Sequence, residues 1–326
     1  MKKRLLCFIL AATLLPAYAF SQKTDTLIQK LDSLTRKTDS AGGQVNNTDL
    51  QVYNEATKIT FQTYFILLGS DFKQQLTAPF HTNKKGWMKV AKFGLFVAAV
   101  TLLDEPVQNY ALNLRDNNPA IGTIGSYVTR FGGDFEAYTL LGLGTYGFIF
   151  KNEKIKTTTL LATQAYITTG AIERILKFLA GRQRPNYIDP KTNENDPTFH
   201  GPFFQFKKDE NGNRVSNEAY SAFPSGHAAV AFAAATVFAM EYIKTPIVGI
   251  ISYSAATLIG ISRVTENRHW LTDVLSGAAL GYLCGKQVVN NFHRYAKIKS
   301  GEKKNSVSFN LQYFHGRVLP GLVYKF

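Results

Sequence analysis

The chain has 326 residues, of which 45% are hydrophobic and 13% aromatic, and this composition excludes a largely disordered protein. Lys and Arg outnumber Asp and Glu by 37 to 23, which gives a formal net charge of +14 at pH 7. The basic residues do not gather with aromatic residues into a nucleic-acid motif, so the charge favours contact with a membrane surface and not with DNA or RNA.

The first residues have the layout of a secretory signal peptide. Three basic residues, 2–4, precede an apolar stretch over residues 5–16, and small residues follow. We therefore predict a signal peptide over residues 1–21. This segment contains Cys7, so the mature chain would keep Cys284 alone and could form no intramolecular disulfide.

The next part of the chain predicts a helical extension over residues 22–85. Residues 25–36 carry Leu and Ile at helical spacing, residues 39–49 are rich in Gly, Asn and Ser, and a second helical run follows over 50–70. Neither helical run holds candidate chemistry. We expect both to pack as a cap on the main domain.

Six apolar segments then predict an all-α domain over residues 86–292, an antiparallel bundle with about six core helices. In such a bundle, the end of the third segment, the start of the fourth, the end of the fifth and the start of the sixth lie on one side. The segments cover about 86–103, 137–150, 157–179, 227–240, 247–261 and 273–289. Residues 104–136 are predicted to form a connection on that same side.

The last part, residues 293–326, begins with a basic segment and then changes character. From Ser306 onwards apolar and polar residues alternate in two runs around Gly316, which predicts a small β-hairpin. Two strands cannot close a membrane barrel, so we expect the hairpin to pack on the helices.

Three short stretches at the common side of the bundle hold the candidate chemistry. Phosphoryl transfer needs rigid donors that converge on one small volume and stabilise charge on the phosphate oxygens. Arginine offers a planar fork, lysine a point charge, and a helix start with a serine and a glycine offers backbone N–H groups. The candidate phosphate-binding residues are Lys177, Arg184, Ser225, Gly226 and Arg263.

Two histidines and a carboxylate supply the remaining catalytic groups. His269 and Asp273 are four residues apart, so on a helix they share a face, and the carboxylate can hold one ring nitrogen protonated while the other attacks phosphorus. His227 comes from a different stretch and is the candidate general acid for the leaving oxygen.

The three stretches resemble the three-part motif of the type 2 phosphatidic acid phosphatase (PAP2) superfamily. They are spaced as Lys-x6-Arg-Pro, Pro-Ser-Gly-His and Ser-Arg-x5-His-x3-Asp, in that order, without substitution at the defining positions. The resemblance implies an all-helical phosphatase in which His269 forms a phosphohistidine, which water hydrolyses with His227 as base. It covers roughly residues 87–292.

The distribution of lysines predicts an orientation. The lysines lie mostly in the connections opposite the three stretches, whereas the connections beside them are net acidic, so a positive-inside bias places the active site outside the cytoplasm. The uncharged stretches are about 12 to 17 residues long, below the roughly 20 of a spanning helix. Both a membrane protein and a soluble periplasmic enzyme therefore remain open.

We expect a metal-independent phosphatase that hydrolyses lipid phosphate or pyrophosphate esters, with no cofactor and no obligate protein partner. The six histidines show no metal-ligand spacing. Three alternatives remain open: a soluble periplasmic acid phosphatase, a vanadate-dependent haloperoxidase and a catalytically silent envelope protein. The motifs do not choose among phosphatidic acid, phosphatidylglycerophosphate, undecaprenyl pyrophosphate and a lipid A phosphate.

Overall fold

The computed structural model describes residues 53–55, 57–188, 195, 197–206, 208, 218–304, 306–314 and 317–325, and from residue 300 onwards only the course of the main chain. The predicted signal peptide and the predicted helical run over 25–36 lie outside the described residues.

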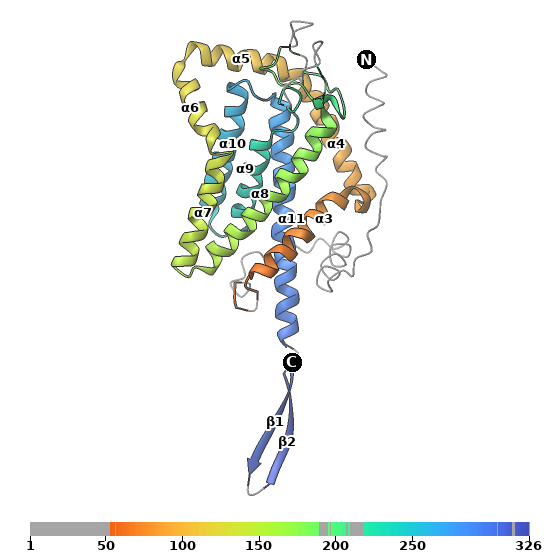
Figure 1. The fold of residues 1–326 in the computed structure, drawn as a ribbon, viewed down its shortest axis with the longest axis vertical. Helices are drawn as coiled ribbons and strands as arrows, with labels where there is room; N and C mark the ends of the chain where they lie inside the picture. The colour runs from red at the N-terminus through yellow and green to blue at the C-terminus, as the bar shows by residue number, and fades with distance from the viewer. Residues whose placement is uncertain are drawn as a thin grey trace.

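The described part of the chain is a helical bundle, which confirms the expected all-α class (Figure 1). The six predicted apolar segments correspond to α4 and to α7 through α11. The helices are α3 (Phe61–His81), α4 (Lys84–Val100), α5 (Asp104–Asn117), α6 (Pro119–Arg130), α7 (Asp134–Ile149), α8 (Glu153–Ala180), α9 (Gly226–Glu241), α10 (Pro246–Thr265) and α11 (Leu271–Lys304). Short 3-10 turns, η2 (Thr101–Leu103) and η3 (Phe204–Phe206), lie between them.

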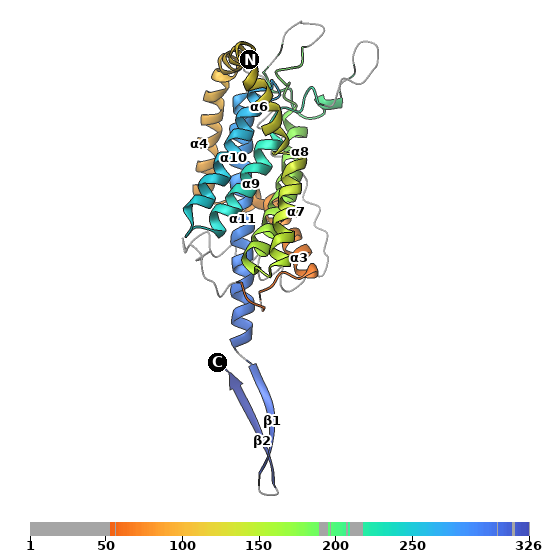
Figure 2. The ribbon, with the colours of Figure 1, turned by 90° about the vertical axis from the view of Figure 1, so that its left-hand side faces the viewer.

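Helices α7 to α11 run alternately up and down, and α4 stands beside α11 (Figures 1 and 2). The end of α8, the start of α9, the end of α10 and the start of α11 therefore meet at one end of the bundle, which we call the motif end. Helix α5 runs across this end, whereas α3 lies obliquely against α8 and α11 in the other half.

The connection over residues 104–136 holds more structure than its sequence indicated, because α5 and α6 occupy most of it. Asn118 caps α6, where its Oδ1 accepts from the N–H of Ala120 at 3.3 Å, and Pro119 occupies the first helical position. These Asn and Pro residues mark a helix start and not a long loop. The run predicted over 50–70 is also displaced, because α3 begins only at Phe61, after the Thr60 cap.

The central packing in the bundle is the close approach of α9 and α11. Three glycines at four-residue spacing, Gly277, Gly281 and Gly285, form one stripe on α11. A methyl group at Gly281 would lie 2.1 Å from the carbonyl oxygen of Ala229 on α9. Only glycine at these positions lets the two backbones come so near. This contact fixes α9 against α11, and both helices begin at the motif end.

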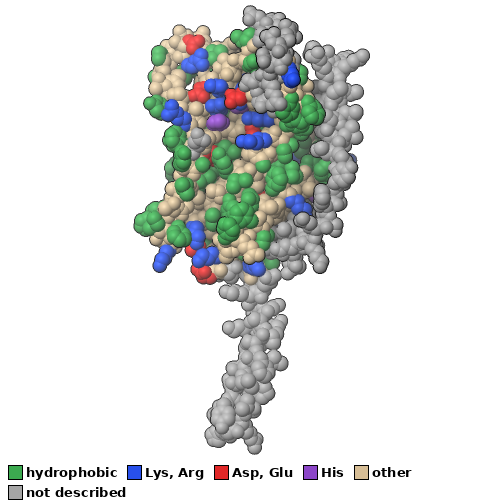
Figure 3. Space-filling model, viewed as in Figure 1, with side chains coloured by type: hydrophobic (Ala, Val, Ile, Leu, Met, Phe, Trp, Pro, Cys, Tyr) green, Lys and Arg blue, Asp and Glu red, His purple; other side chains and the backbone are tan. Residues whose placement is uncertain are grey.

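The outside of the bundle is unusually apolar. Large hydrophobic side chains on α4, α7 and α10 are exposed, among them Leu95, Leu141, Phe148 and Ile251. Figure 3 shows hydrophobic side chains spread over the middle of one face, with Lys and Arg near both ends of that face. By length and composition, two helical stretches of the described chain are able to cross a membrane, Lys84–Asn117 and Pro246–Thr265.

The chain ends in two strands, β1 (Ser306–Phe314) and β2 (Arg317–Lys325), which pair antiparallel with Ser306 opposite Lys325. The predicted packing of this hairpin on the helices is not observed. In both views the strands lie beyond the end of α11, away from the rest of the bundle (Figures 1 and 2).

Candidate active site

The first stretch begins in the last turn of α8. Lys177 forms an ion pair with the buried Glu173 one turn earlier, with 2.5 Å between Nζ and Oε1. The helix ends at Gly181, whose φ of 55° is left-handed and whose N–H donates to the Lys177 carbonyl. A methyl group at Gly181 would lie 2.2 Å from the carbonyl oxygen of Gly201. Glycine is therefore required for the turn that leads to Arg184.

The second stretch forms the start of α9, as predicted for Ser225 and Gly226. Ser225 is fully buried and caps the helix, with Oγ accepting from the N–H of Ala228 at 3.5 Å. A methyl group at Gly226 would lie 2.7 Å from Glu173 Oε1, so the helix start sits directly on the Lys177 ion pair. The first N–H groups of a helix attract anions, so this end of α9 is suited to phosphate.

Two guanidinium groups reach this site from different elements. Arg263, in the last turn of α10, is buried and donates to Thr129 on α6 and to Glu266 at 3.1 Å. Arg184 donates to Ser221 Oγ at 3.4 Å. The Nε of each guanidinium is buried and has no hydrogen-bond partner among the described residues. Both groups therefore keep donor capacity for a further acceptor.

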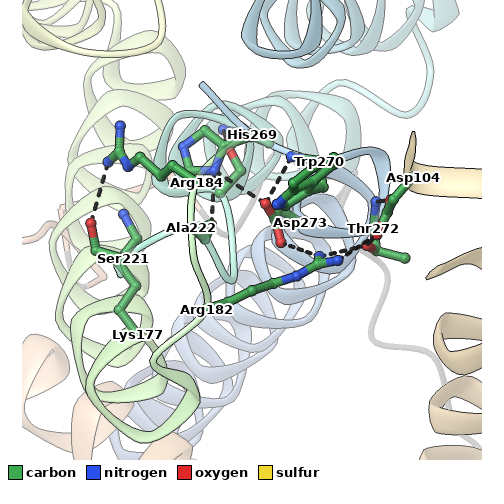
Figure 4. A network of polar contacts seen from close by, with 12 residues as sticks. Asp104, Lys177, Arg182, Arg184, Ser221, Ala222, His269, Trp270, Thr272 and Asp273 are labelled. Atoms are coloured by element: carbon green, nitrogen blue, oxygen red, sulfur yellow. Dashed lines mark hydrogen bonds and ion pairs between the residues drawn. The ribbon is translucent and has the colours of Figure 1, made fainter. Parts of the chain in front are cut away.

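His269 lies among these cations and is only 1% exposed. Its Nδ1 is 2.8 Å from the carbonyl oxygen of Ala222 (Figure 4). A carbonyl can only accept, so Nδ1 carries the proton and Nε2 keeps its lone pair. Burial, followed by the charges of Lys177, Arg184 and Arg263, lowers the pKa of the His269 imidazole well below 6.5. The ring is thus a neutral base with a defined tautomer.

Asp273 lies beside His269, but not across a shared helix face as predicted. His269 precedes α11, so the two residues do not share a helix face, and Asp273 Oδ2 lies 3.6 Å from His269 Nδ1. That oxygen instead accepts from the N–H of Trp270 at 2.8 Å, which caps the start of α11. The group that orients His269 directly is the Ala222 carbonyl, which sequence reasoning had no means to identify.

A buried network around Arg182 holds the first and third stretches together, and sequence reasoning missed it. Arg182 is fully buried and donates to Asp273 Oδ1 at 2.7 Å, to Thr272 Oγ1 at 2.7 Å and to Asp104 Oδ2 at 2.5 Å (Figure 4). Asp104, at the start of α5, also accepts from the N–H of Thr272 at 2.9 Å. We call Asp104, Arg182, Thr272 and Asp273 the clamp.

The main chain around the clamp links it to the catalytic candidates. The Arg182 carbonyl accepts from the N–H of Ala222, whose own carbonyl holds His269. The Asp273 carbonyl accepts from the N–H of Ser225 at 2.9 Å. The clamp therefore joins all three stretches. A second arginine in the first stretch was its sequence signal, but nothing marked Asp104 as the partner.

His227 lies in the first turn of α9, against the turn between α6 and α7. A methyl group at Gly133 would lie 3.3 Å from His227 Nε2, and one at Gly132 would lie 3.3 Å from its Cδ2. His227 is also among the groups that lower the pKa of His269. The structure thus brings both histidines to the same site as Lys177 and the two arginines.

The aromatic residues of the connection between the first two stretches contact α8. The rings of Phe203 and Phe206 have their centroids 5.1 and 6.0 Å from that of Phe178, next to Lys177. Both side chains stay more than half exposed. They anchor this connection and leave an apolar surface near the candidate site.

Comparison with known proteins finds similarity to the same family. Residues 158–296 match the PAP2 superfamily model. Over 74 residues the chain is 47% identical to a lipid A 1-phosphatase of Porphyromonas gingivalis, covering 22% of this chain and 17% of that protein. Over 147 residues it is 28% identical to a probable lipid phosphate phosphatase 4 of Arabidopsis thaliana, covering 41% and 47%. The chain thus spans less than half the length of each.

A crystal structure of LpxE from Aquifex aeolicus is also similar, with 22% sequence identity and a TM-score of 0.40. The match covers 58% of this chain and 95% of that one. A likeness this distant carries no argument about the site.

Proposed function

We propose, from the match of residues 158–296 to the PAP2 superfamily model and from the geometry of the site, that the chain is a metal-independent phosphatase that hydrolyses lipid phosphate or pyrophosphate esters at the extracytoplasmic face of a membrane. The observation that carries the proposal is the environment of His269. A neutral imidazole with a free Nε2 lone pair lies among three cations and beside a helix start. This arrangement suits an attack on a tetrahedral anion.

In the first step, the phosphate group binds Lys177, Arg184, Arg263 and the start of α9. His269 Nε2 attacks phosphorus, a P–N bond forms, and the P–O bond to the lipid breaks. His227, protonated in the complex with the anionic phosphate, gives its proton to the departing oxygen. The cations stabilise the charge on the three remaining oxygens.

In the second step, water attacks the phosphohistidine. His227, now neutral, takes a proton from the water, the P–N bond breaks, and inorganic phosphate leaves while His269 regains its lone pair. The Nδ1–H of His269 stays bonded to Ala222 throughout, which keeps the ring aimed at phosphorus. Asp273 acts on this geometry through the clamp and through Trp270.

Three observations support a membrane location. The helices expose a band of large apolar side chains, two helical stretches of the described residues have the length and composition of membrane spans, and α9 is a shorter apolar helix. Such a band favours a membrane enzyme over the soluble periplasmic alternative.

The orientation proposal rests on the lysines. Lys84 begins α4, Lys154 lies at the turn from α7 to α8, and Lys244 lies at the turn from α9 to α10. All of these turns lie opposite the motif end. A positive-inside bias thus supports a site that faces the periplasm.

The test is phosphate release from a panel of lipid phosphates in detergent, next to p-nitrophenyl phosphate. We expect turnover of lipid phosphates, and for His269→Ala a loss of roughly 10⁴-fold or more with the fold intact. Retained turnover in that variant would refute the mechanism. Preference for the soluble ester would favour the periplasmic acid phosphatase, and bromide oxidation with added vanadate would favour the haloperoxidase.

A further inference from the structure

A polar cavity lies at the motif end, beside α5. It has a volume of about 320 Å³ and is lined by Glu105, Gln108, Asn109, Leu112, Asn195 and Trp270. This volume lies at the lower end of the range of small-molecule pockets, roughly 300–1,000 Å³. None of the residues assigned above to phosphate binding or to the chemical steps lines it.

Gln108 contributes a buried side-chain amide to this cavity. The residue is only 2% exposed, and its Oε1 is buried without a hydrogen-bond partner in the described part of the chain. Its Nε2 donates to the Val264 carbonyl at 3.1 Å and to Asn267 Oδ1 at 2.8 Å. The amide is thus held in one orientation with an acceptor left unused, and a buried unpaired acceptor destabilises the fold unless a ligand or water donates to it.

The walls of the cavity belong to the chain segments that build the phosphate site. Val264 and Asn267, which hold Gln108, lie between Arg263 and His269 in sequence. Trp270 follows His269 directly. The cavity and the phosphate site are therefore built in part from the same loop.

The first stretch borders the cavity as well. Asn195 Nδ2 donates to the Pro185 carbonyl at 3.3 Å, next to Arg184, and the Trp270 indole donates to the Gln183 carbonyl at 2.8 Å. Helix α5 runs across the end of the bundle (Figure 1), so in a membrane the cavity would lie at the level of the lipid headgroups.

The lining favours hydroxyl groups. Side-chain amides can both donate to and accept from a hydroxyl, and Glu105 adds an acceptor. Among the described residues that line the cavity there is no Lys or Arg, and the Glu105 carboxylate would repel a second phosphate. We propose that this cavity is a subsite for the hydroxyl-bearing headgroup, sugar or glycerol, of the lipid phosphate whose phosphate lies at His269. The proposal rests on the function proposed above.

The test compares three lipid substrates in the full-length protein: a lipid with its phosphate on a sugar, phosphatidylglycerophosphate, and phosphatidic acid, which has no free hydroxyl. Asn109→Leu fills the cavity and removes an amide. The matched control is Asn113→Leu, the same change one turn further along α5 at an exposed position outside the lining. Thermal unfolding of each variant is measured in parallel.

We expect Asn109→Leu to lower kcat/KM roughly tenfold for the hydroxyl-bearing substrate, as is usual when a polar site loses a partner for a substrate hydroxyl. Phosphatidic acid turnover should not change, and Asn113→Leu should leave all three substrates unaffected. A selective loss on the sugar lipid or on phosphatidylglycerophosphate identifies which headgroup binds.

An equal loss on all three substrates, or no loss on any, would overturn the subsite while the phosphatase function stands. Absence of lipid phosphate turnover by the unmodified protein would overturn the proposed function, and the subsite with it.

Discussion

The clamp gives the sharpest test of how the fold positions the catalytic histidine. Asp104→Asn keeps the size of the side chain and an oxygen able to accept from the N–H of Thr272, but it removes the negative charge beside Arg182. The guanidinium then keeps one carboxylate partner, Asp273, and is still fully buried. The start of α11 should shift, and His269 with it.

The size of the effect follows from burial. Breaking a fully buried ion pair costs about 3–5 kcal/mol, because the remaining charge stays out of water. For a domain of this size, that corresponds to a fall in melting temperature of roughly 6–20 °C. Displacement of the imidazole on the order of 1 Å would lower kcat by about 10²-fold. KM should change little, since Lys177, Arg184 and Arg263 keep their places.

The assay needs a control that separates stability from positioning, and the bundle supplies one. Glu241 is another fully buried carboxylate, at the opposite end of α9, where it accepts from His293 Nε2 at 2.8 Å and from Tyr53. Glu241→Gln should lower the melting temperature by a similar amount and leave kcat unchanged. Both variants are compared by steady-state kinetics and thermal unfolding in one detergent.

Two results would refute a positioning role for the clamp: Asp104→Asn loses stability but keeps wild-type kcat, or both variants lose kcat equally. The first result would make the clamp a purely structural pair. The second would mean that turnover follows global stability and not the local position of His269.

Three further predictions concern the packing, the imidazole and the absence of metal. Gly281→Ala should destabilise the bundle by about 1–3 kcal/mol through its clash with Ala229. The control Gly142→Ala, which has nothing within 4 Å of the added methyl group, should be neutral or slightly stabilising. Equal melting temperatures of the two variants would refute the close contact. Burial and the charge of Lys177 lower the pKa of His269, so the ring stays neutral as the pH falls through 6.5. The kcat/KM profile should therefore show no acid limb near that pH, once it is corrected for the second ionisation of the phosphate substrate at about 6. Lys177→Met should raise the pKa of His269. An acid limb near pH 6.5 in the unmodified protein would contradict a neutral His269. Chelator should leave turnover unchanged, and activity that is lost and then restored by a divalent ion would refute the metal-free mechanism.

The residues that form the candidate site could be predicted from the sequence, because the site depends on a few residues at fixed spacing. Lys177, Arg184, Ser225, Arg263 and the two histidines lie at ends of apolar segments, and antiparallel threading places these ends together. Segment periodicity is a local property, so the core helices were also predictable. Roles in catalysis stay predictions until the variants are measured.

Contacts between segments that are distant in sequence could not be predicted and became visible only in the folded chain. The Ala222 carbonyl orients His269, although a carbonyl has no sequence signature, and Asp104 meets Arg182 from 78 residues away. The sequence placed Asp273 beside His269 because of their spacing on an assumed helix; the two side chains are 3.6 Å apart, but α11 begins two residues after His269, so they do not share a helix face. Hydrophobic periodicity specifies which residues are buried, whereas the partner of a buried charge depends on how the helices pack.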